Sequence, residues 1–435
     1  MPGKKKGKGK GKGKKKKSKK PKGMLENPAD VVKRLQRVYM AQCQTKNSAV
    51  CPGLKKFLKD CYEDNRLSVK FILEPIPDFE DPDLTNVQLD PLILAIRAER
   101  FKYIKELHVW DIPLKHADVA NLALMMEKGP YPISRLELVD CSIESYAAER
   151  LLRNCAGLTN LTTLSLDYNE IGDSGCIGIC KGLMKNETMI SLSLCYCDLG
   201  VQSGTALGQV VSTTAIREVY LNGNNLEAEG VSELIRLAVD HAEAESYQRA
   251  QEAIKKADEE ALALLAEKER SRVKTAFDDP ESKPSSAKSS KGGKKKKKKG
   301  KKKKKSKEPP GPPPKGPLIY KLHLADNGID MYGKGSTYAP IIAMRLFRTL
   351  VENSSCLQEL DLDDNLIGDL GGREIMEGLR ARKEAGLDGV KVSVTHRMNG
   401  DTFREIMKLG SGLSKKKKKK GKGKKKVRQF VYVGF

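Results

Sequence analysis

The chain has 435 residues, a formal net charge of +25 and 39% hydrophobic residues. That length suits one large repeat array or two to three ordinary domains. No apolar run approaches the length of a membrane span, and the stretch after Met1 is polycationic, so we expect neither membrane insertion nor a signal peptide.

The net charge hides two opposite populations. Residues 1–23 carry 13 Lys and no acid, residues 283–316 carry 16 Lys and one Glu, and residues 415–428 carry 10 Lys and one Arg. These segments total +39, which leaves −14 for the rest of the chain. Runs of Lys and Gly bury nothing and repel themselves, so we predict disorder at 1–23, 275–317 and 411–435. The electrostatic candidates in these runs are Lys14, Lys15, Lys16, Lys17, Lys294, Lys295, Lys301, Lys302, Lys415 and Lys416.

Residues 24–100 predict a helical N-terminal cap. Asn27 suits an N-cap, Pro28 the first helical position and Asp30 the first turn, so a helix should begin here. A second short helix is expected near residues 54–62, and a strand and a third helix should follow it. Such caps cover the apolar end of a stack of repeats.

A repeat organises residues 101–230. The stretch LTTLSLDYNEIG, which begins at Leu161, matches L-x-x-L-x-L-x-x-N/C-x-L, and its Asn169 can satisfy backbone groups as the chain turns. The central apolar positions recur at steps of 27 to 29 residues, which leaves room for a strand and a full helix in each repeat. The central positions are Leu107, Leu136, Leu164, Leu192 and Val219, followed later by Leu322, Leu360 and the degenerate Val390.

The repeats are interrupted by an insertion of about 75 residues between Val219 and Leu322. Residues 231–274 lack Pro and are dominated by strong helix formers, which predicts one long charged helix. It is either a solvated arm or a lever that docks on a neighbour. The repeats resume in phase in residues 318–410, so we expect Ala242 to Pro317 to be dispensable for folding.

The spacing resembles the ribonuclease-inhibitor type of leucine-rich repeat over roughly residues 100–395. The resemblance implies an α/β solenoid in the shape of a horseshoe, with parallel strands inside and helices outside. The long helix and the Lys-rich segments would be additions to it. The fold hosts many unrelated binding roles, so it does not name a partner.

The ten cysteines follow no disulfide or metal-site spacing. Cys141 and Cys197 occupy repeat turns, and Cys176 and Cys180 lie one helical turn apart. A metal site would need Cys/His pairs at a recognised spacing. We therefore expect structural thiols in a reducing compartment, no metal and no cofactor.

Side chains that alternate with the buried leucines should line the concave face. Trp110 is the single Trp of the chain, and it either anchors a partner or packs against the N-terminal cap. The candidate partner-binding residues are His108, Trp110, Asp140, Asp167, Tyr168, Tyr196, Tyr220, Asn222, His323, Asp361 and Asp363.

None of the five His belongs to a Ser or Cys nucleophile motif, so we expect a non-enzymatic protein. Polycations on tethers suit nucleic acid, anionic membranes or acidic protein tails. The runs lack the aromatic and Arg residues of nucleic-acid readers, and no lipid site or amphipathic helix adds membrane attachment. Acidic protein surfaces such as tubulin tails are the favoured partner, and nucleic acid is the second choice.

Repeat proteins of this type with Lys-rich tails and inserted charged helices resemble structural components of ciliary and flagellar axonemes. The resemblance implies a cytoplasmic scaffold or adaptor on the cytoskeleton, among microtubules. Two alternatives stay open. One is a nuclear or nucleolar protein that uses its Lys runs for import and nucleic-acid binding. The other is a regulator that binds an enzyme through the concave face.

Overall fold

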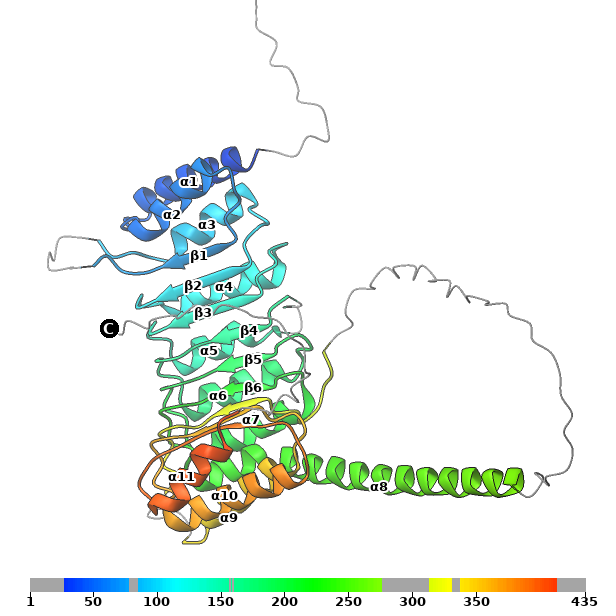
Figure 1. The fold of residues 1–435 in the computed structure, drawn as a ribbon. Coiled ribbons are helices and arrows are strands. Elements are labelled where there is room, and N and C mark those ends of the chain that lie inside the picture. Colours follow the sequence, from blue (N-terminus) through cyan, green and yellow to red (C-terminus); the bar gives the residue numbers. More distant parts are fainter. Residues whose placement is uncertain are drawn as a thin grey trace, which may run out of the picture.

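The computed structural model confirms the predicted solenoid. Among the described residues, nine parallel strands form one sheet in the order β1 to β9, and helices cover its outer side (Figure 1). The ten electrostatic lysines and most of the segments predicted to be disordered lie outside the described residues. The structure describes residues 27–77, 85–155, 158, 160–275, 313–330 and 337–412.

The N-terminal end consists of α1 (Pro28–Thr45), α2 (Pro52–Glu63), β1 (Lys70–Leu73) and α3 (Asp90–Glu99). Asn27 takes the predicted N-cap position of α1, although its side chain makes no capping hydrogen bond there. Strand β1 pairs in parallel with the first repeat strand. This end therefore extends the sheet as one degenerate repeat.

The repeats supply the other strands and helices. The strands are β2 (Glu106–Trp110), β3 (Arg135–Val139), β4 (Thr163–Ser165), β5 (Ser191–Ser193), β6 (Glu218–Tyr220), β7 (Lys321–His323), β8 (Glu359–Leu362) and β9 (Lys391–Val394). The helices are α4 (His116–Lys128), α5 (Ser145–Leu152), α6 (Gly172–Leu183), α7 (Val201–Thr213), α8 (Glu227–Thr275), α9 (Ala339–Asn353), α10 (Gly368–Glu384) and α11 (Gly400–Leu409).

The central apolar residues of the repeats lie side by side along the sheet. Leu164 on β4 lies opposite Leu136 on one side and Leu192 on the other. Val219 on β6 pairs with Leu322 on β7, so the repeats resume in phase across the insertion, as predicted. All five are at most 1% exposed, which makes this column the inner edge of one continuous core.

The last repeat departs from the prediction. The spacing placed Val390 at the central position, but Leu360 pairs with Val392. The chain after α11 returns to β9, where the Gly412 N–H donates to the Val390 carbonyl and the Val392 N–H donates to the Gly410 carbonyl. These closing hydrogen bonds accompany the shift of two residues, which the repeat spacing alone does not encode.

Asn169 has the role predicted for the turn asparagine. Its Oδ1 accepts the N–H groups of Cys141 and Ile143, each at 3.0 Å. Its Nδ2 donates to the carbonyls of Leu138 at 2.8 Å and Leu166 at 2.7 Å. One side chain therefore satisfies buried backbone groups of two neighbouring repeats. The same pattern recurs at Asn224 and Asn365.

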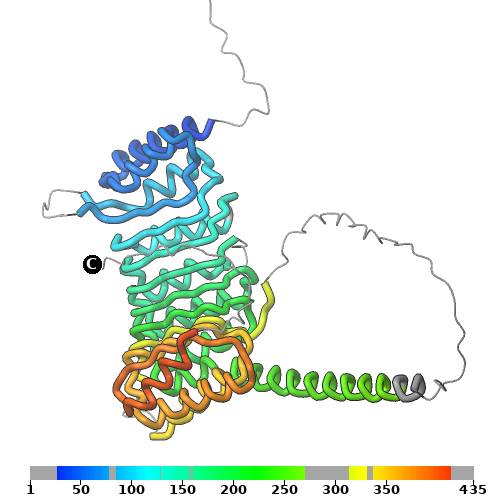
Figure 2. Tube along the Cα trace, in the orientation of Figure 1, coloured from blue at the N-terminus to red at the C-terminus, as the bar shows by residue number. Residues whose placement is uncertain are grey.

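Helix α8 begins as a repeat helix and then leaves the stack (Figure 2). Ala242 is still buried, and Arg249 donates a hydrogen bond to the Asn353 carbonyl near the end of α9. Residues 250–269 are all exposed. The expectation that residues from Ala242 onward are dispensable stays a prediction, but the helix packs on the solenoid as far as Arg249, so a removable segment should begin after that residue. We call residues 250–275 the arm.

The cysteines are structural, as predicted. All ten are free thiols, and eight of them are buried. Burial raises the pKa of Cys141, Cys155 and Cys197 to about 12 each, so these thiols stay protonated at neutral pH.

Candidate protein-binding surface

Much of the charge on the concave face is paired between neighbouring strands. The Lys321 ammonium lies 3.1 Å from the Glu218 carboxylate, and Lys391 pairs with Glu359. The His323 ring lies 3.8 Å from Glu359 as well. The hydrogen bond from Lys391 is the main reason why the pKa of Glu359 is lowered. This end of the face offers little uncompensated charge to a partner.

The N-terminal end of the face corrects the prediction for His108. Its Nδ1 lies 2.5 Å from Glu137, its Nε2 lies 3.3 Å from Glu106, and its exposed fraction is 2%. Trp110 is half-buried and packs edge-on against His108, with centroids 5.7 Å apart. His108 is therefore closed off by its neighbours and is not an available contact. Trp110 packs against the His108 ring, and part of the Trp110 surface remains accessible to solvent.

Polar residues in the middle of the face are held by internal hydrogen bonds. Asp167 accepts the Ser193 hydroxyl at 2.7 Å and the Cys195 N–H at 2.8 Å. The Asn222 Oδ1 accepts the Ala325 N–H at 3.0 Å. These groups stabilise the junctions between strands, which leaves them fewer free lone pairs for recognition.

Tyr168 and Tyr196 form an exposed aromatic pair where β4 and β5 end. Their rings are stacked, with centroids 4.7 Å apart and 8° between the planes, yet the residues are 54% and 46% exposed. Both have left-handed backbones, with φ of 58° and 54°. Gly223 holds the next equivalent position, where a Cβ would lie 2.2 Å from the Tyr196 ring. Glycine thus lets Tyr196 lie over the following turn.

Exposed carboxylates flank this tyrosine pair along the same edge of the solenoid. None of them forms an ion pair with a Lys, Arg or His in the described ranges. The pKa of Tyr196 is raised by desolvation first, and then by Tyr168 and by the negative charges of Asp326 and Asp364. Two of these acids, Asp326 and Asp364, therefore act electrostatically on the Tyr196 hydroxyl. We define the acidic rim as Asp111, Asp140, Glu170, Asp198, Asp326, Asp363 and Asp364, all of them exposed.

The structure divides the predicted partner-binding residues into three groups. The first group lies on or beside the acidic rim and consists of Asp140, Tyr168, Tyr196 and Asp363. Trp110, Asp167, Tyr220, Asn222, His323 and Asp361 are partly buried on the concave face, and His108 is buried. Glu170, Asp198 and Asp326 were not predicted. Their signal in the sequence is an acid that recurs shortly after several of the strands, among them β4, β5 and β7.

Other chemistries find little support in the described part of the chain. It contains no group of three His, Cys, Asp or Glu side chains that could hold a metal ion. Within those same ranges, no helix combines the length and apolar character required to cross a membrane. Cys195 lies beside Ser193 and Asp167, but burial raises its pKa to about 11, so it is a poor nucleophile at neutral pH.

A family model described as Leucine Rich repeat matches residues 157–180 and 353–376. The chain is 24% identical to mouse ribonuclease inhibitor over 228 residues, which is 47% of this chain and 48% of that protein. The chain carries leucine-rich repeats of the ribonuclease-inhibitor type. Pig ribonuclease inhibitor is 28% identical over 149 residues, 34% of this chain and 32% of that protein.

A third relative has a different architecture around the same repeats. Mouse NACHT, LRR and PYD domains-containing protein 12 is 25% identical over 220 residues, 46% of this chain and 20% of that protein. The chain thus spans about half or less of the length of the curated relatives it matches. Leucine-rich repeats of this type support a protein-interaction scaffold, whose surface varies between relatives while the repeat stays the same.

Proposed function

We propose that this protein is a non-enzymatic scaffold of ciliary and flagellar axonemes. Its solenoid binds one protein through the Tyr168–Tyr196 pair and the acidic rim. Its Lys-rich segments attach it to acidic protein surfaces such as tubulin tails. The protein thereby links a partner to microtubules.

The separation of charge along the chain supports this proposal most directly. The three Lys-rich segments carry +39, while the remainder of the chain carries −14. Polycationic segments gain affinity for acidic tails through many weak contacts, and several such segments on one chain raise the effective concentration of each other. The remainder of the chain carries the opposite charge and so is not attracted to the same acidic tails. Its surface is therefore free to bind a different partner.

The acidic rim favours a basic partner with planar cations. An Arg guanidinium stacks well on a tyrosine face and pairs with carboxylates in two-point geometry. Tyr168 and Tyr196 offer such faces, and Asp140, Asp326 and Asp364 offer unpaired carboxylates on either side. The partner segment expected here is therefore rich in Arg and poor in acids.

A second candidate function is regulation of an enzyme through the solenoid. The similarity to ribonuclease inhibitors, which are inhibitors by name, favours this alternative. A third reading, a nuclear protein with the Lys runs as import signals, rests on composition alone.

Microscopy of the endogenous protein tests the proposal. Staining along axonemes, in register with tubulin, is the expected result. Nuclear staining without axonemal signal would contradict it and favour the nuclear reading. Diffuse cytoplasmic staining would contradict it as well, and would favour the enzyme regulator.

A further inference from the structure

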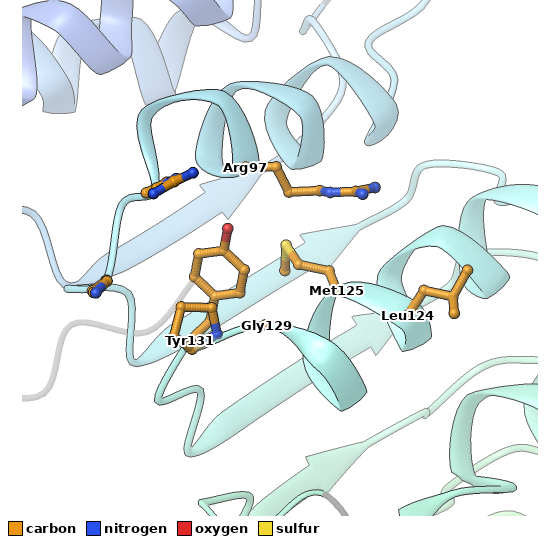
Figure 3. Close-up of a pocket in the computed structure, with 8 residues that line it drawn as sticks. Arg97, Leu124, Met125, Gly129 and Tyr131 are labelled. Atoms are coloured by element: carbon orange, nitrogen blue, oxygen red, sulfur yellow. The ribbon is translucent and has the colours of Figure 1, made fainter.

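A pocket lies on the opposite edge of the solenoid, near the N-terminal end. It has a volume of about 580 Å³, within the range typical of ligand sites. The end of α3, the loop that follows it, α4, and the loop between α4 and β3 form its walls (Figure 3). The pocket is lined by Arg97, Arg100, Lys102, Leu124, Met125, Gly129, Pro130 and Tyr131.

The charge of this pocket is positive and uncompensated. Arg97, Arg100 and Lys102 are exposed, and none of them forms an ion pair with another described residue. The nearby acids are engaged elsewhere. Glu99 lies 3.2 Å from Arg34, and Glu127 lies 2.9 Å from Arg150.

Local helix chemistry accounts for two of the three cations. Arg97 lies in the last turn of α3, where a positive charge favours the helix dipole. Arg100 follows the helix with a left-handed backbone, φ 48°, a position that favours Gly or Asn. Lys102 lies beyond the helix altogether. The left-handed backbone does not call for Arg at position 100, although the helix dipole favours its charge there, and the helix does not explain why Lys102 is basic.

The floor of the pocket is apolar. Met125 is buried and Leu124 is 37% exposed. At Gly129 a Cβ would lie 2.2 Å from the Tyr131 ring and 2.4 Å from the Met125 carbonyl oxygen, so only glycine lets that ring lie against the backbone. Burial raises the pKa of Tyr131, and the charges of Arg97 and Arg100 oppose this rise. Both guanidinium groups thus act on the same hydroxyl, which Figure 3 shows directed into the pocket.

We propose that this pocket binds an acidic peptide in which one large apolar side chain stands between carboxylates. The carboxylates pair with Arg97, Arg100 and Lys102 in charge-assisted hydrogen bonds. The apolar side chain lies on Leu124, Met125 and Tyr131. The Lys-rich segments attract any acidic chain, whereas this pocket selects among acidic chains by the apolar residue. The inference does not depend on the acidic rim.

The test uses the full chain and two fluorescent peptides. One has a phenylalanine between two runs of glutamate, and the other has glycine in its place. The Lys-rich segments bind both equally, so only the difference between the peptides reports on the pocket. Burying a phenyl ring should make the wild-type protein bind the phenylalanine peptide about tenfold tighter, measured by fluorescence anisotropy.

The pocket variant is Arg100→Glu with Lys102→Glu. Its matched control is Lys181→Glu with Lys185→Glu, which changes the same charge at exposed positions near the end of α6. We expect the pocket variant to bind both peptides alike, and the control to keep the tenfold preference. Equal urea unfolding curves of the two variants establish that both are folded.

Three results would overturn the proposal. The wild-type protein could show no preference between the peptides, or the pocket variant could keep the preference. The control variant could also lose the preference, which would indicate a general effect of surface charge. Microtubule binding through the Lys-rich segments would persist in each case, so failure here is distinct from failure of the proposed function.

Discussion

Tyr168 stacks on Tyr196 across two neighbouring repeats, with the ring centroids 4.7 Å apart, and both residues remain about half exposed. Exposed aromatic rings add little to folding but often dominate binding. We expect Tyr168→Ala with Tyr196→Ala to lower the unfolding free energy by about 1 kcal/mol or less. Binding of a fluorescent Arg-rich peptide should weaken at least about tenfold.

Tyr146→Ala is the matched control for this pair. Tyr146 is 60% exposed and stacks on His116 with ring centroids 4.7 Å apart, but it lies on helix α5 and takes no part in the Tyr168–Tyr196 stack. It should leave peptide binding unchanged. Equal loss of binding in both variants would show that the tyrosine pair is not the recognition surface.

We expect Asn169 to contribute more to stability than any residue of the acidic rim, because its side chain is buried and bonds several backbone groups. Asn169→Ala leaves two N–H groups and two carbonyls without their partner in a buried turn. We expect a loss of about 2–5 kcal/mol in urea unfolding. The control is Asn225→Ala, because Asn225 is exposed and makes a single side-chain bond to Asp198. A loss below about 1 kcal/mol at Asn169 would contradict the role of the turn asparagine.

Much of this fold follows from the spacing of a few residues. The leucines at steps of 27 to 29 residues place the strands. Val219 pairs with Leu322 across the insertion because each strand of this parallel sheet contacts only the neighbouring strands, so a long connection outside the sheet does not change the register. The shift to Val392 does not follow, because residues beyond α11 close the sheet there. Repeat spacing cannot reveal such a closing contact.

The position of the candidate site could be predicted from the sequence, but the solvent exposure of its residues could not. Tyr168 and Tyr196 occupy equivalent positions one repeat apart, so their proximity follows from the stack. Burial of His108 depends on two glutamates and Trp110 around one ring. The pocket beside Tyr131 joins α3, α4 and the loops that follow them, which share no motif. Lateral contacts of this kind depend on side-chain conformations that a repeat pattern does not specify.

The arm should be removable, provided that the cut respects the packed part of α8. Replacing residues 251–312 with a flexible Gly/Ser linker should leave the thermal midpoint unchanged, because residues 250–269 are exposed. Starting the replacement at Ala242 should lower the midpoint, since it removes a buried side chain and the Arg249–Asn353 hydrogen bond. Calorimetry of both variants decides the matter, and identical midpoints would contradict the boundary at Arg249.

Acid should weaken the fold in part through Glu137. The hydrogen bond from His108 is the main cause that lowers the pKa of Glu137 below its ordinary 4.5. A carboxyl with a depressed folded pKa stabilises the fold above its unfolded pKa, and this contribution disappears as the pH falls through the folded pKa. The unfolding free energy of the wild type should therefore fall more steeply below about pH 4.5 than that of Glu137→Gln.

Glu170→Gln is the control for this pH dependence. It removes one exposed carboxylate of the acidic rim without touching His108. Its unfolding free energy should follow the wild-type pH profile. Parallel profiles for Glu137→Gln and the wild type would contradict the contribution assigned to Glu137.

The most direct measurement of the proposed scaffold role is co-sedimentation of the full chain with microtubules. Exposed Lys–carboxylate attraction is screened over about 8 Å at physiological ionic strength, so binding should weaken steeply as salt rises. Microtubules from which the acidic tubulin tails have been cleaved should bind much less protein. Duplex DNA measured in parallel should bind more weakly than intact microtubules. Tighter binding to DNA, or equal binding to intact and cleaved microtubules, would contradict the proposal that this solenoid is held on microtubules by its Lys-rich segments.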